Sequence, residues 1–172
     1  MENNINIQQP SVNSSAVSWT YAGFWWRFLA YIIDSLVLSF VTGILFLPVT
    51  AVMGISLFSF MDNPEAINDF SFFGPIILAE LGMVFTSMLI QWLYFALMES
   101  SKYQATLGKM ALGIKVTDME GNRINFGRAT GRHFAKILSS FILMIGYIMA
   151  GFTAKKQALH DILANCLVIK TR

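Results

Sequence analysis

The sequence predicts an all-α integral membrane protein with two transmembrane helices and a third apolar segment that spans the bilayer or re-enters it. Hydrophobic residues make up 55 % of the 172-residue chain and charged residues 13 %, whereas a soluble domain carries about 25 % charged residues. The uncharged residues also gather in long stretches. This composition excludes an ordinary cytosolic enzyme, a disordered chain and a disulfide-stapled secreted module.

Residues 1–20 are expected to form a disordered polar tail in front of one membrane domain over residues 21–170. The start of the chain is rich in Asn, Gln and Ser and has no basic residue before Arg27. A cleaved signal peptide begins with basic residues and continues into a short apolar run, so none is expected here. Polar segments of this kind bury too little apolar surface to fold.

The first two predicted helices cover about residues 24–47 and 72–98. Each supplies the roughly 20 helical residues that cross a hydrocarbon core of about 30 Å. Pro48 follows the first helix and either ends it or kinks it, because proline lacks the backbone N–H that a helix interior needs. Aromatic residues at the start of the first helix and the end of the second fit the interfacial belt of membrane proteins.

The connection between these helices and the loop after them differ in charge. Residues 61–71 contain no basic residue, while residues 99–136 contain seven. Because cytoplasmic loops carry the excess of Lys and Arg, the N-terminus and the basic loop are expected to be cytoplasmic in a multi-pass protein of the cell (inner) membrane. Within the loop, residues 113–127 alternate between polar and apolar around a turn at Gly121, which predicts a small β-hairpin.

The third apolar segment, residues 137–154, leaves two topologies open. As a helix it extends about 27 Å, which is barely one crossing. If it crosses fully, the basic C-terminal tail lies outside, against the positive-inside rule. If it re-enters the bilayer or lies in the inner interface, both of its flanks stay in the cytoplasm.

Three charged residues lie within the first two apolar segments: Arg27, Asp34 and Glu80. A charge at the bilayer centre costs about 2.5–3.5 kcal/mol, so each is expected to face protein or water and to have a partner. In one interpretation, Asp34 and Glu80 line a hydrated path and exchange protons or bind a monovalent cation. In the other, the charged residues form a structural network that joins helices or the subunits of a homo-oligomer.

Arg128, Arg132 and Lys136 recur at every fourth position and therefore share one face of a helix. This face is expected to contact the anionic headgroups of the lipid bilayer. The alternative is that the three residues are only the basic flank of the apolar segment that follows.

Nothing in the sequence predicts an enzyme. The segment LGKMALG lacks the first glycine of a phosphate-binding loop and the Ser or Thr after its lysine, and no serine lies in a nucleophile-elbow pattern. With two histidines and one cysteine in the chain, a dedicated metal site is not expected. We therefore expect no catalytic residue, no cofactor and no nucleic-acid partner.

Three segments, in this order, resemble the RDD family, bacterial membrane proteins named for one arginine and two aspartates. The segment YAGFWWRFLAYIIDSLVL resembles the family's first helix, with the arginine at Arg27 and the first aspartate at Asp34. TLGKMALGIKVTDMEGNRI resembles its Gly-Lys segment, and KKQALHDILANCLVI resembles its closing motif, with the second aspartate at Asp161. The resemblance runs from about Tyr21 to Ile169.

The resemblance implies a membrane protein of largely unassigned molecular function, with transport, including cation/proton exchange, proposed for the family. If Arg27, Asp34 and Asp161 act together, the C-terminal tail lies on the cytoplasmic side with Arg27. The chain has Asn165-Cys166 where the family usually has Gly-Thr, which leaves the aspartate in place. We expect either a small transporter, or a non-transporting scaffold or accessory subunit in which the charged residues are structural.

Overall fold

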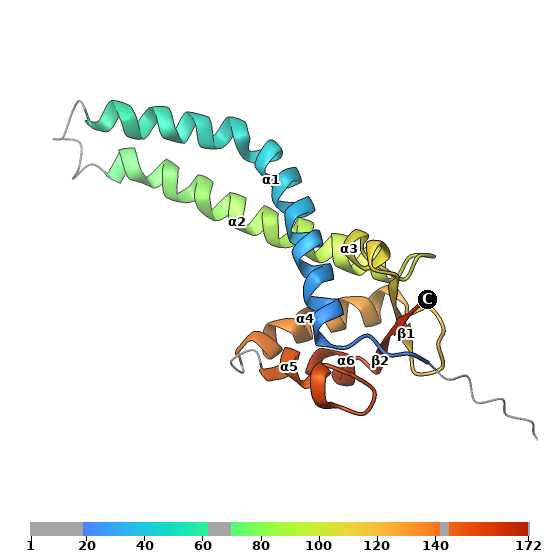
Figure 1. Ribbon diagram of the computed structural model, residues 1–172. Coiled ribbons are helices and arrows are strands. Elements are labelled where there is room, and N and C mark those ends of the chain that lie inside the picture. The colour runs from blue at the N-terminus through green and yellow to red at the C-terminus, as the bar shows by residue number, and fades with distance from the viewer. Residues whose placement is uncertain (1–18, 62–69, 142–144, 172) are drawn as a thin grey trace, which may run out of the picture.

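The computed structural model describes residues 19–61, 70–141 and 145–171 of the chain. These residues form, in chain order, α1 (Phe24–Met61), α2 (Phe70–Glu99), α3 (Leu107–Ala111), β1 (Ile114–Asp118), α4 (Phe126–Phe141), α5 (Ile145–Phe152), α6 (Leu159–Leu163) and β2 (Cys166–Lys170). Figure 1 shows α1 and α2 as a long pair that projects from a compact body made of the remaining elements. The fold is mostly helical, as predicted, and contains one small two-stranded sheet.

The two predicted long helices are confirmed. α1 contains the apolar stretch Phe24–Phe58 and α2 the stretch Phe73–Glu99, and each is long and apolar enough to cross a membrane. Of the two outcomes expected at Pro48, the structure shows the second, because α1 continues through Pro48 to Met61 and so extends beyond the expected 24–47. Figure 1 shows that α1 bends, as expected for a helix in which an internal proline removes a backbone hydrogen bond.

Each long helix has a part embedded in the body and a distal part. The 38 residues of α1 extend about 57 Å, nearly twice the hydrocarbon core of a bilayer. Ala30, Asp34 and Leu38 are buried along one face of α1, and no described residue of α1 beyond Leu38 is buried. In α2 the buried positions lie within the last turns, from Phe95 to Glu99, among the side chains that the structure describes.

The predicted β-hairpin is wrong, because β1 pairs with the C-terminal strand β2 in antiparallel fashion. The predicted turn does form, since the carboxylate of Asp118 accepts the backbone N–H of Asn122 at 2.7 Å. Asn125 then accepts the N–H of Arg128 at 2.8 Å and so caps the start of α4. The chain therefore enters a helix where the second strand of a hairpin was expected.

The backbone before α1 lies along the other edge of β2. The N–H of Ala22 donates to the carbonyl of Val168, and the N–H of Lys170 donates to the carbonyl of Thr20, both at 2.8 Å. Thr20, which we expected in the disordered tail, thus belongs to the folded body, while residues 1–18 of that tail lie outside the described residues. β2 therefore holds the entry of α1 and the end of the chain together.

The predicted third helix over residues 137–154 is divided between two helices. α4 ends at Phe141 and α5 begins at Ile145, so a single spanning helix is wrong for this segment. The two helices contact one another and approach closely at Gly146, where an added Cβ would lie 2.8 Å from the Cβ of Ser139. A larger side chain at this position would push α4 and α5 apart.

The core of the body consists mainly of small and β-branched side chains. Its buried members are Ala22, Ala30, Ala96, Ile114, Val116, Ile124, Ala129, Cys166 and Val168. The alanines come from α1, α2, α4 and the segment before α1, and they share one cluster with side chains of β1 and β2. This packing brings together the polar residues that lie next to the alanines on the same helices.

Candidate functional site

A buried ion network joins both long helices to the body. Its six members come from five helices: Arg27 of α1, Glu99 of α2, Lys109 of α3, Arg132 and Lys136 of α4, and Asp161 of α6. Their side chains are between 0 and 20 % exposed. An unpaired charge in a protein interior costs several kcal/mol, so these groups have to neutralise one another.

Asp161 is the carboxylate on one side of the network. Its Oδ1 accepts a hydrogen bond from Nε of Arg132 at 2.8 Å, and its Oδ2 accepts one from Nη1 of Arg27. The backbone N–H of Ala158 also donates to Oδ2, at 3.0 Å, which closes the first turn of α6. Because Arg27 donates in addition to the carbonyl of Lys156 at 2.6 Å, the start of α1 is held at two points of the C-terminal segment.

Glu99 is the carboxylate on the other side. Its Oε2 lies 2.6 Å from Nη1 of Arg132, and its Oε1 pairs with Lys109 and lies 3.9 Å from Nζ of Lys136. Arg132 therefore bridges the two carboxylates, with Nη1 toward Glu99 and with Nε and Nη2 toward Asp161. A guanidinium fits this role because its donors lie in a planar fork, whereas a lysine carries a single point charge.

Asp34 lies apart from the ion network and has donors of its own. Its Oδ1 accepts hydrogen bonds from the hydroxyl of Tyr94 at 2.8 Å and from the backbone N–H of Gly108 at 2.7 Å, and its Oδ2 accepts one from the hydroxyl of Thr106 at 2.5 Å. The residue is 1 % exposed. Asp34 thus supplies the acceptor that holds the start of α3 against α1, a role that the side chain of Thr106 does not fill.

The Gly-Lys pair at the start of α3 contacts two carboxylates, those of Asp34 and Glu99. A Cβ added to Gly108 would lie 2.2 Å from the carbonyl oxygen of Ala30, so only glycine allows α3 to rest on α1. The N–H of Gly108 then reaches Asp34, and the ammonium of Lys109 reaches Glu99. The segment LGKMALG, which does not have the pattern of a phosphate-binding loop, therefore connects α3 to α1 and α2.

Arg132 and Asp161 stabilise each other's charged forms. Burial alone would raise the pKa of Asp161, but the positive charges of Arg27 and Arg132 hold it well below its ordinary value. Burial likewise opposes the charge of Arg132, and the carboxylates of Glu99 and Asp161 nevertheless raise its pKa above the ordinary value. Both groups are therefore charged at neutral pH.

Lys136, at the edge of the network, predicts a pH-dependent stability. Burial, reinforced by Lys109 and Arg132 and opposed by Glu99, lowers the pKa of Lys136 from 10.5 to about 7. Between these two values the unfolded chain binds a proton that the folded chain does not, so stability is expected to rise with pH.

This rise is measurable as the difference in melting temperature between pH 7 and pH 9 in detergent. The wild type should gain more over this interval than Lys136→Met, in which the titrating group is absent. The range stops at pH 9 because burial raises the pKa of the Cys166 thiol to about 11, which acts in the opposite direction at higher pH. Equal gains in the two proteins would show that Lys136 does not titrate in this range.

The structure brings only part of the predicted site together. Arg27 and Asp161 pair directly, whereas Asp34 is held separately. Glu80 is exposed on the distal part of α2, and it forms no ion pair with any residue that the structure describes. The four predicted network residues therefore occupy three different environments.

The predicted basic face of α4 divides in the same way. Arg128 is exposed, as a residue in contact with headgroups has to be. The predicted headgroup contact is wrong for Arg132, which is 2 % exposed and bound to two carboxylates. Lys136 faces inward as well, with its ammonium 4.1 Å from the centre of the Phe95 ring and near Glu99.

Sequence reasoning missed Glu99 and Lys109 as site residues. Glu99 follows directly on an apolar helix and therefore looked like the polar flank of a span. Its signal was that it is the last residue of a helix otherwise nearly free of charge, followed by a loop rich in cations. Lys109 was visible within the Gly-Lys segment, but the sequence did not show which carboxylate it meets.

The fold and the site define a membrane-protein class with two long apolar helices fastened to a compact body by buried ion pairs. The RDD family model matches residues 21–165. The chain belongs to the RDD family, which confirms the resemblance seen in its motifs. Asn165 adopts a left-handed backbone with φ 50°, a conformation that favours Gly or Asn, and this explains why Asn is accepted where the family usually has Gly.

Two relatives come from Bacillus subtilis (strain 168). The chain is 38 % identical over 148 residues to "Uncharacterized protein YxaI", which covers 86 % of this chain and 96 % of the relative. It is 31 % identical over 155 residues to "Uncharacterized membrane protein YteJ", which covers 87 % of this chain and 80 % of the relative. No solved structure matches the chain.

Proposed function

We propose that this chain is a non-transporting membrane scaffold or accessory subunit without enzymatic activity, in which buried charges fasten the body to the α1–α2 pair. The observation that carries the proposal is the coordination of Asp34. Three protein donors occupy its two oxygens, and the residue is 1 % exposed. A carboxylate held in this way has almost no contact with solvent, and three of its roughly four lone-pair sites are already used, so it is poorly placed to bind a cation or exchange a proton.

The other predicted reading, a small cation/proton exchanger, finds less support in this geometry. Asp161 and Glu99 are also occupied, by two basic groups or more each. In the described distal parts of α1 and α2, beyond Leu38 and before Trp92, Glu80 is the one residue with a formal charge. A single carboxylate on a two-helix pair does not line a path across a bilayer.

Asp34→Asn tests the structural role against a matched control, Glu80→Gln, which removes the other carboxylate of the predicted membrane path. We expect Asp34→Asn to lower the free energy of unfolding by about 1–3 kcal/mol, because an amide NH₂ then faces donors that need an acceptor. Glu80→Gln keeps a polar side chain of similar size and should not lower the stability. The check is the melting temperature of purified protein in detergent, and a lowered value for Glu80→Gln alone would reverse the assignment.

The same proposal places the chain in the cell membrane with its body on the cytoplasmic side. The start of α1, the end of α2 and β2 all belong to one body, so these segments lie on one side of the membrane. The basic residues that the body carries favour the cytoplasmic side. Tags at the two termini should both be inaccessible from outside intact cells, and external labelling of either one would disprove this orientation.

Two partners remain part of the proposal. Glu80 is exposed on an apolar helix, where an unpaired carboxylate is costly, and a second copy of the chain would cover it in a homo-oligomer. Arg128 is exposed on α4 and available to anionic headgroups. If the first partner is right, Glu80→Leu changes the oligomeric mass in detergent, and an unchanged mass argues against it.

A further inference from the structure

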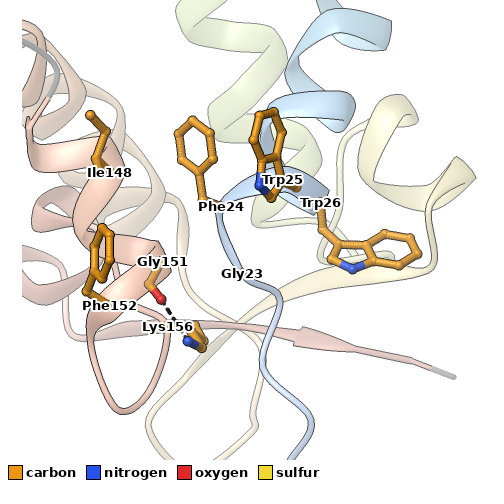
Figure 2. A pocket seen from close by; sticks show the side chains of 8 residues that line it. All are labelled: Gly23, Phe24, Trp25, Trp26, Ile148, Gly151, Phe152 and Lys156. Carbon is orange, nitrogen blue, oxygen red and sulfur yellow. Dashed lines mark hydrogen bonds between the residues drawn. The ribbon is translucent and has the colours of Figure 1, made fainter.

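A groove with aromatic walls lies between the start of α1 and α5. It has a volume of about 610 Å³, within the roughly 300–1,000 Å³ of typical ligand sites. The residues that matter here are Phe24, Trp25, Trp26, Ile148, Phe152 and Lys156. Figure 2 shows Phe24 and Trp25 on one side, Ile148 and Phe152 on the other, and Lys156 between them toward one end. We refer to this feature as the α1–α5 groove.

The walls of the groove are suited to lipid. Trp25 is 70 % exposed and Phe152 is 85 % exposed, although both side chains are large and apolar. The groove lies where the apolar stretch Phe24–Phe58 begins, which is the level at which aromatic side chains meet the membrane interface. At this level hydrocarbon chains are the apolar groups available to cover such side chains.

A cation lies at one end of the same groove. The ammonium of Lys156 donates to the carbonyl of Gly151 at 2.7 Å. Its other two donors have no hydrogen-bond or carboxylate partner among the described residues. The backbone of Lys156 is left-handed, with φ 49°, a conformation that is unfavourable for a lysine. Its carbonyl is bound by Arg27, so the ion network fixes the segment that carries this ammonium.

We propose that the α1–α5 groove is a binding site for one anionic phospholipid. An acyl chain lies along the aromatic walls, and the headgroup phosphate accepts hydrogen bonds from the ammonium of Lys156. An anionic lipid satisfies both the apolar walls and the free donors, whereas a soluble anion leaves the walls exposed. This site is distinct from the ion network, and it stands whether or not the chain transports an ion.

The test measures lipids retained by the full chain, by native mass spectrometry after mixing with detergent micelles that contain phosphatidylglycerol or phosphatidylcholine. The wild type should prefer phosphatidylglycerol about fivefold, since one lysine near an anionic headgroup contributes about 1 kcal/mol. Lys156→Gly should lose the preference and remain folded, because glycine accepts the left-handed backbone. Lys155→Gln, the same loss of charge one residue away, should keep it.

Filling the groove supplies the second arm of the test. A Cβ added to Gly151 would lie 3.9 Å from the Cβ of Phe24, so Gly151→Leu extends into the groove without displacing the backbone. This variant should retain neither lipid at the site. Equal losses in Lys155→Gln and Lys156→Gly would show diffuse attraction to headgroups and overturn the site, and so would undiminished binding by Gly151→Leu.

Discussion

Asp161→Asn is expected to lower the free energy of unfolding by about 3–5 kcal/mol, because it leaves the guanidinium groups of Arg27 and Arg132 buried without their shared counter-ion. Asp161 is fully buried and binds both arginines. Its loss frees the start of α1 from α6 and α4. The change is therefore expected to detach the body from the first long helix as well as to reduce overall stability.

The measurement is thermal or denaturant unfolding in detergent, with Glu120→Gln as the matched control. Glu120 is an exposed carboxylate in the turn after β1 and makes no ion pair within the described residues, so its substitution should change stability by less than about 0.5 kcal/mol. If Asp161→Asn also changed the free energy of unfolding by less than about 0.5 kcal/mol, the ion pairs of α6 would contribute little to stability.

Glu99→Gln is expected to have an effect of similar size, about 3–5 kcal/mol, through the other half of the ion network. Glu99 neutralises Lys109 and Arg132 and attracts Lys136, so its loss leaves three basic groups near one another. Repulsion among them should loosen α3 and α4 from the end of α2.

The specific signature of this change is partial rescue. Lys109→Met removes one of the uncompensated cations, so the double variant Glu99→Gln/Lys109→Met should be more stable than Glu99→Gln alone. Melting temperatures of the two single variants and the double variant form a thermodynamic cycle that isolates the pair. Strictly additive losses would show that Glu99 and Lys109 do not interact.

The long helices were predictable because a bilayer imposes a simple requirement, a run of about 20 apolar residues. The pairing of β1 was not, because alternation indicates that a segment is suited to a strand but does not name its partner. The partner, β2, lies near the other end of the chain, and the residues after the turn follow the capping preference of Asn125 instead. The sequence left open whether Pro48 ends or kinks the first helix, and the exposed apolar residues that continue α1 beyond it correspond to the kink.

The candidate site was predictable only where a motif carried it. The motifs named Arg27, Asp34 and Asp161, and in the structure the first and the last form an ion pair. The four-residue spacing of Arg128, Arg132 and Lys136 placed them on one helix side but did not show that the side turns inward over most of its length. A basic residue on α4 can flank a membrane segment or form a buried ion pair. Which of the two it does depends on how α2 and α6 pack against α4, and the local sequence does not show this packing.

Ion flux through purified protein in liposomes distinguishes buried charges that are structural from charges that carry an ion. A pH gradient is imposed, Na⁺, K⁺ or Li⁺ is added in turn, and folded wild type is compared with empty liposomes and with Asp34→Asn. If the buried charges are structural, no cation should speed the collapse of the gradient in the wild type above the level of empty liposomes. Cation-dependent collapse in the wild type that a folded Asp34→Asn variant lacks would instead make Asp34 the carrier of an exchanger.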